Sequence, residues 1–107
     1  MAITNTRIES ATETVVFDTP LNQEYAITTM FFCNTSDTED TTLDIHLVPG
    51  GQSLSTGTQV IKALSLPHSE TFVFDAEKLI LENGDTIQAR ATVDQIVVAT
   101  ISSVKTS

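Results

Sequence analysis

The stretch that decides the fold is ETFVFDAEKLILENGDTIQARATVDQIVVATISSV, residues 70–104. Within it two runs, 87–93 and 96–104, alternate or nearly alternate apolar with polar residues, and only Asp94 and Gln95 separate them. Alternation of this kind is typical of strands with one buried face. So short a separation predicts that the two runs form an antiparallel hairpin.

A tight turn is expected just upstream. Asn83-Gly84 is the residue pair that most readily adopts positive φ. It therefore predicts a reversal between the strand that contains 79–81 and the strand that opens at Asp85.

The rest of the chain shows further short strands separated by loops. We expect strands at 14–17, 24–34, 41–48, 60–66 and 70–74, with 75–78 forming a turn or one helical turn. The run 24–34 is apolar on both parities, which indicates a central strand covered on both faces. About eight strands and no helical stripe predict an all-β antiparallel sandwich, immunoglobulin-like or jelly-roll, because two sheets are the usual way to bury so many alternating faces. The pattern leaves the strand order open.

At 107 residues the chain is expected to form one domain. We assign 14–107 to a single β-sandwich and 1–13 to an N-terminal arm. The arm is polar, with isolated Ile3 and Ile8. It forms either a short edge strand or a segment that neighbouring subunits order.

The composition argues against several classes of function. The formal net charge is −9, and the chain has no Trp and one Tyr, so we expect no binding of nucleic acid. The N-terminus lacks the features of a signal peptide and no run approaches membrane-spanning length, so we expect a soluble protein made in a cytoplasm, without membrane contact. The single cysteine, Cys33, excludes an intrachain disulfide, and its apolar surroundings indicate a buried small side chain.

Residue types that carry chemistry are sparse. His46 falls on the polar face of the strand 41–48 and His68 in a proline turn, so both are interpreted as surface histidines. A small hydrolase would need a histidine close to a carboxylate and a hydroxyl in space. Cys33 has no flanking base, and no Gly-x-Ser-x-Gly motif occurs. We therefore predict no enzyme activity, no catalytic residue, no cofactor and no metal site.

Two loops contain residue types that are found in ligand sites. The acidic stretch from Asp37 to Asp44 offers oxygen ligands but lacks the glycine and the spacing of a calcium loop, so we interpret it as a solvated loop and leave ion binding open. The glycines and hydroxyls of 50–58 are followed by no helix and no P-loop lysine, which favours a projecting contact loop over a phosphate site.

Six segments of this chain carry a likeness to known proteins: FCNT at 32–35, IHLVPGG at 45–51, LSLP at 64–67, ETF at 70–72, KLILENGDTIQA at 78–89 and VVATIS at 97–102. On these segments the chain resembles small β-rich virion proteins of tailed bacteriophages, including marine and cyanobacterial ones. The resemblance implies an accessory part attached to the capsid, neck, tail or fibres, and it supplies no active-site residue.

We therefore expect a non-enzymatic virion structural protein that assembles in multiple copies at the neck or tail or decorates the capsid, with other virion proteins and its own copies as partners. Apolar strand faces left uncovered in one subunit would be buried against neighbours. The alternative is a carbohydrate- or host-surface-binding module, against which the lack of Trp counts. The expected contact elements are Ile3, Ile8, Gln52, Ser53, Leu54, Ser55 and Thr56.

Overall fold

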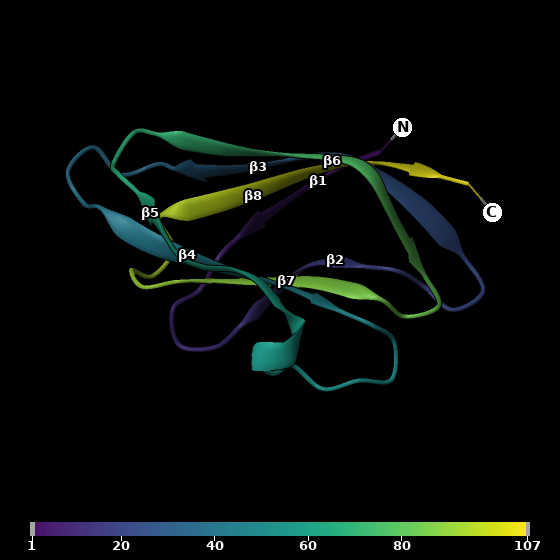
Figure 1. Ribbon diagram of the computed structural model, residues 1–107. Coiled ribbons are helices and arrows are strands. Elements are labelled where there is room, and N and C mark those ends of the chain that lie inside the picture. The colour runs from purple at the N-terminus through teal and green to yellow at the C-terminus, as the bar shows by residue number, and fades with distance from the viewer. Residues whose placement is uncertain (1, 107) are drawn as a thin grey trace.

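The computed structural model describes the backbone of residues 2–106 and their side chains except those of residue 2 and residues 76–78. These described residues form eight strands and one short 3-10 helix, η1: β1 Ala2–Arg7, β2 Thr14–Asp18, β3 Glu24–Asn34, β4 Thr41–Val48, η1 Thr56–Thr58, β5 Gln59–Leu66, β6 Thr71–Glu82, β7 Thr86–Ala91 and β8 Val97–Lys105. Figure 1 shows them as two packed layers. The prediction of an all-β antiparallel sandwich is confirmed.

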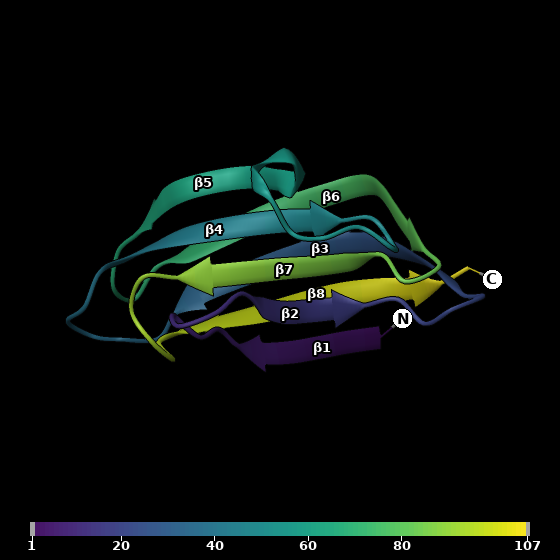
Figure 2. The same ribbon diagram turned by 90° about the horizontal axis from the view of Figure 1, so that it is seen from below.

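Each layer is a four-stranded antiparallel sheet. Sheet A has the order β1-β8-β3-β6 and sheet B the order β2-β7-β4-β5, and Figure 2 shows sheet B in front of sheet A. The first strand thus pairs with the last, the second with the seventh, the third with the sixth and the fourth with the fifth. This is the jelly-roll arrangement, which decides between the two predicted kinds of sandwich.

The predicted hairpin of 87–93 with 96–104 is wrong. β7 pairs with β2 and β4 in sheet B, whereas β8 pairs with β1 and β3 in sheet A. The short connection between them crosses from one sheet to the other, with Gln95 at φ 60°. Both strands do bury alternate residues, among them Ala89 and Ala99. Alternation identifies the buried face of a strand, but it is the same whether the next strand lies beside it or opposite it.

The predicted turn at Asn83-Gly84 is confirmed. Both residues have positive φ, 42° and 84°, and the Asp85 amide donates to the Glu82 carbonyl at 3.0 Å. This turn also joins the two sheets rather than two paired strands. The turn or helical turn expected at 75–78 is not formed, because β6 continues through these residues.

The core lies between the sheets and is built from inward-facing residues of every strand except β1, and in β2 an irregularity in the register brings the consecutive residues Val16 and Phe17 into it. Its members with at most 2% exposure include Ile27, Met30, Phe32, Leu43, Ile45, Ile87, Val97 and Ile101. β3 is central in sheet A, as predicted, but only one of its faces is covered, because Phe31 on the other face is 39% exposed. Phe72 and Phe74 pack against the core from β6, as their shared parity predicts.

The N-terminal residues belong to the sandwich. β1 is an edge strand of sheet A, which is the first of the two expected alternatives. Immediately after it, the Ile8 amide donates to the Val97 carbonyl at 2.8 Å, and the Ile8 side chain is fully buried in the core. Ile8 was expected to contact neighbouring subunits, but in the folded chain it packs inside.

Candidate functional site

The outer surface of sheet A is the first candidate. Residues that are register partners on adjacent strands share a face of the sheet. The register places residues of all four strands on the side opposite the core, and we call twelve of them the outer A face: Ile3, Asn5 and Arg7 of β1, Ser102, Thr100 and Val98 of β8, Thr29, Phe31 and Cys33 of β3, and Asp75, Val73 and Thr71 of β6. Ala26, Ile80 and Val104 continue the same side toward the β2–β3 and β6–β7 turns, and Glu24 and Glu82 follow them.

The outer A face combines five apolar residues with five neutral polar ones and two charged ones. Ile3 is 66% exposed, Val73 52% and Phe31 39%. Arg7 and Asp75 are the only charged residues among the twelve, so their charges sum to zero, whereas Glu24 and Glu82 lie beyond the twelve on the same side of the sheet. Large exposed apolar side chains gathered on one face are typical of interaction surfaces.

Cys33 lies on this face rather than in the core. It is a free thiol of intermediate exposure, between its register partners Val98 and Thr71. The prediction that Cys33 is buried is therefore wrong. Apolar residues occupy both faces of β3, so the sequence does not indicate which face of the strand packs against the core.

A polar cluster on sheet B is the second candidate. His46 is only 5% exposed, so its interpretation as a surface histidine is wrong. Its Nδ1 lies 2.9 Å from Thr58 Oγ1, and its Nε2 lies 3.7 Å from Glu13 Oε1. Thr58 belongs to η1 and Glu13 directly precedes β2, so these two segments cover the imidazole. The alternation of residues 41–48 does not indicate that other segments cover the polar face of this strand.

The cluster contains the three groups that a hydrolase would need, but its hydrogen bonds oppose catalysis. Thr58 Oγ1 donates to the Ser55 carbonyl at 2.8 Å and accepts the Ser55 amide at 3.2 Å. Because the hydroxyl proton is already committed, His46 Nδ1 donates to Thr58 instead of withdrawing a proton from it. The hydroxyl is buried with its residue and fixes the cap of η1.

The carboxylate of this cluster is in an unfavourable place for a charge. Burial raises the pKa of Glu13, and the nearby Asp44 carboxylate raises it further, while His46 and Arg90 oppose the rise. Glu13 Oε2 is buried without a hydrogen-bond partner. The cluster thus holds the segment before β2 and η1 against the outer side of sheet B.

The expected contact loop is largely exposed. All of residues 50–57 are exposed, including Gln52, Ser53, Leu54, Ser55 and Thr56. Ser55 caps η1 by accepting the Gly57 amide at 3.1 Å. Thr58, the last residue of that loop, is turned inward toward His46.

Two carboxylates of the acidic stretch from Asp37 to Asp44 accept hydrogen bonds from other parts of the chain. Asp40 Oδ1 accepts the His68 amide at 3.0 Å and lies 2.7 Å from His68 Nδ1, and these two bonds lower the pKa of Asp40. Asp44 Oδ1 accepts the Ala63 amide at 2.7 Å, where β5 bulges. His68 is exposed, as predicted. Within the described part of the chain, no group of acidic, histidine or cysteine side chains has the arrangement of a metal site.

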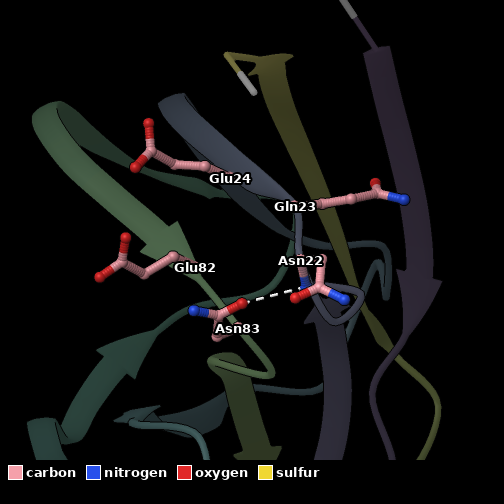
Figure 3. Close-up of a pocket in the computed structure, with 5 residues that line it drawn as sticks. All are labelled: Asn22, Gln23, Glu24, Glu82 and Asn83. Atoms are coloured by element: carbon pink, nitrogen blue, oxygen red, sulfur yellow. Dashed lines mark hydrogen bonds between the residues drawn. The ribbon is translucent and has the colours of Figure 1, made fainter.

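A polar hollow of about 270 Å³ lies at the end of the sandwich, where the β2–β3 and β6–β7 turns meet. Asn22, Gln23, Glu24, Glu82 and Asn83 line it, and the Asn22 amide donates to Asn83 Oδ1 at 3.0 Å. Figure 3 shows both carboxylates on one side and the Gln23 side chain pointing away from them. The lining groups therefore do not converge on one point.

Among residues 2–106, no helix has the length and apolar character to cross a membrane.

No protein-family model matches this chain, and no curated protein or solved structure matches it either. The resemblance to virion proteins of tailed bacteriophages therefore stays a prediction.

Proposed function

We propose that this protein is a non-enzymatic structural component of a virion, which assembles in multiple copies at the neck or tail of a tailed phage or decorates its capsid. The outer A face carries the proposal. A sheet surface with Ile3, Phe31 and Val73 exposed is suited to burial against another protein surface. The jelly roll is frequent in viral capsid proteins, which supports this function.

The distribution of charge gives the mechanism. Fourteen acidic residues against five basic ones give the free subunit a strongly negative net charge, which favours its solubility. The twelve residues of the outer A face have no net charge, so a neighbouring protein meets less like-charge repulsion there than over the acidic loops. Docking through this face leaves the acidic loops outward.

The test is to look for the chain in particles. Virions from the phage whose genome encodes it are purified by density gradient, and the chain is quantified by mass spectrometry against the major capsid protein. We expect a fixed ratio of many copies per particle that survives a high-salt wash. Particles without the chain would contradict the proposal. The matched variant Phe31→Asp should fold, judged by circular dichroism, and be reduced in the particles at least tenfold.

A carbohydrate-binding module is the second candidate, because the amides and carboxylates that line the polar hollow are groups that pair with sugar hydroxyls, although they do not converge on one point. Sugar sites also use an exposed aromatic ring. Among the described residues Phe31 is the exposed aromatic, and it lies seven residues along β3 from Glu24, roughly 23 Å away. A glycan array with the protein and its Asn83→Ala variant separates the candidates, since only a sugar site predicts binding that the variant loses.

A further inference from the structure

The two charges of the outer A face occupy opposite corners of a regular grid. Across the four strands the register gives three rows: Ile3, Ser102, Thr29, Asp75; then Asn5, Thr100, Phe31, Val73; then Arg7, Val98, Cys33, Thr71. Arg7 and Asp75 are thus separated by three strand spacings, about 14 Å, and by four residues along the strands, about 13 Å. The grid is close to square, and its other diagonal runs from Ile3 to Thr71.

We propose that two copies of this chain pair face to face through their outer A faces, about a two-fold axis that follows the diagonal from Ile3 to Thr71. This inference deepens the proposed function by naming the copy-to-copy contact, and it rests on that function. The axis exchanges the two charged corners, so Arg7 of each copy lies over Asp75 of the second copy. Arg7 Nη1 donates to the Gln95 carbonyl of its own chain at 2.7 Å, and the other N–H groups of the guanidinium are those that would meet Asp75. The strands of the two sheets then cross at a large angle, as in orthogonal sheet packing.

The remaining positions match under the same operation. Phe31 lies close to the axis and meets Phe31 of the second copy near the centre of the contact. Val73 lies over the space between Cys33 and Val98 of the second copy, so that apolar side chains meet apolar ones. An interface with an aromatic pair at its centre has the composition of a specific contact.

The polar positions agree as well. Asn5 lies over the space between Ser102 and Thr29 of the second copy, where hydroxyls can pair with its amide. The symmetry makes every such contact occur twice, as an isologous interface requires.

Other two-fold axes in the plane of the face fit the charges less well. An axis parallel to the strands places Arg7 over Thr71 and Asp75 over Ile3, and an axis perpendicular to the strands places Arg7 over Ile3. An axis along the Arg7–Asp75 diagonal places Arg7 over Arg7 of the second copy and Asp75 over Asp75 of the second copy. The like charges repel, which costs free energy. Only the diagonal from Ile3 to Thr71 pairs opposite charges.

The size of the surface and the net charge set the conditions for pairing. The Cα atoms extend over 42 × 28 × 18 Å, so the broad side is large enough for the roughly 800 Å² that each partner of a standard interface buries. Two copies with a net charge of −9 repel each other at long range. Moderate salt screens this repulsion, and we expect the dissociation constant to fall when the salt concentration is raised from about 10 to 150 mM.

Charge exchange tests the pairing. Sedimentation velocity over a concentration series is measured for the wild-type protein, Arg7→Asp, Asp75→Arg and the double variant. Each single variant places like charges together and should raise the dissociation constant of the dimer at least tenfold, while the double variant should restore it to within about threefold of wild type. Lys62→Asp and Asp18→Arg change the net charge by the same amounts at positions outside the outer A face, and they serve as controls. Both variants should form the dimer with the same dependence on salt as the wild-type protein.

The outcomes of this experiment test the pairing of two copies independently of the proposed role in a virion. A wild-type protein that stays monomeric at 1 mM overturns the pairing but leaves the particle experiment to decide the proposed function. A dimer that the double variant fails to restore overturns the Arg7–Asp75 geometry while self-association stands. If a charge-reversed variant loses the circular dichroism of the native chain, Arg7→Gln and Asp75→Asn take its place, and each should weaken the dimer by at least threefold.

Discussion

His46 Nε2 lies 3.7 Å from Glu13 Oε1, and the pair connects β4 with the segment that leads into β2. The other ring nitrogen donates to Thr58, whose own proton goes to the Ser55 carbonyl. Nε2 and the Glu13 carboxylate can therefore form a hydrogen bond only if one of them carries a further proton. Burial raises the pKa of Glu13, which favours this proton in the folded state.

Replacing Glu13 with Gln should change how stability depends on pH. A raised pKa in the folded state means that folding is favoured below the ordinary value of 4.5 and that this contribution is lost as the pH rises through the raised pKa. Glu13→Gln stays neutral at every pH and has no such loss. We expect the free energy of unfolding of Glu13→Gln, relative to wild type, to increase between pH 4 and pH 7 in urea unfolding. Parallel curves for the two proteins, with exposed Glu9→Gln as the control, would contradict this.

Removal of the His68 side chain should raise the pKa of Asp40 toward its ordinary value of 3.8. The carboxylate accepts both the main-chain amide and the ring nitrogen of His68, and these bonds lower its pKa. Their stabilising contribution is present above pH 3.8 and is lost as the pH falls through the lowered pKa. In His68→Ala the amide bond remains, so the increase should be partial. An NMR titration of the Asp40 carboxyl carbon measures it, and an unchanged midpoint would mean that the ring bond contributes nothing.

The positions of the strands could be predicted from the sequence, because a half-buried strand alternates wherever it lies. β3 and β4 have the expected bounds of 24–34 and 41–48. Their assignment to sheets could not be predicted. β7 and β8 are separated by a turn-sized connection, yet they lie in different sheets. In a jelly roll most strands pair with distant ones, and local patterns carry no information about such pairing.

The candidate sites depend on that long-range pairing. Arg7 and Asp75 share a face only through the registers of β1, β8, β3 and β6. No local motif in the sequence predicts that these two residues lie on one surface. The burial of His46 does not follow from the sequence for a similar reason. Its position on the polar parity of β4 is real, but Glu13 and Thr58 come from distant segments and cover it. The tight turn at Asn83-Gly84, by contrast, depends on local φ preferences and was predicted.

Gly50→Ala should destabilise the fold. A Cβ at this position would lie 2.2 Å from the Asn83 carbonyl oxygen, a backbone atom that cannot move without disturbing the turn between the sheets. We expect a loss of about 2 kcal/mol or more in the free energy of unfolding, comparable with other overpacking substitutions. Gly57→Ala is the matched control, because its nearest neighbour is the Ser55 hydroxyl at 3.4 Å. Thermal unfolding of both variants gives the comparison, and equal effects would show that the two turns do not meet so closely.

Ile8→Ala and Ile3→Ala should differ sharply although they remove the same atoms from the same end of the chain. Ile8 is fully buried, and a truncation of this kind in a core costs about 2–5 kcal/mol through lost burial and the cavity that remains. Ile3 is 66% exposed, so its truncation should change the stability of a single subunit by less than about 0.5 kcal/mol. Urea unfolding at low protein concentration measures both. If Ile8→Ala were as mild as Ile3→Ala, residues 2–8 would not be docked in the free subunit, and the arm would become ordered only against a neighbour.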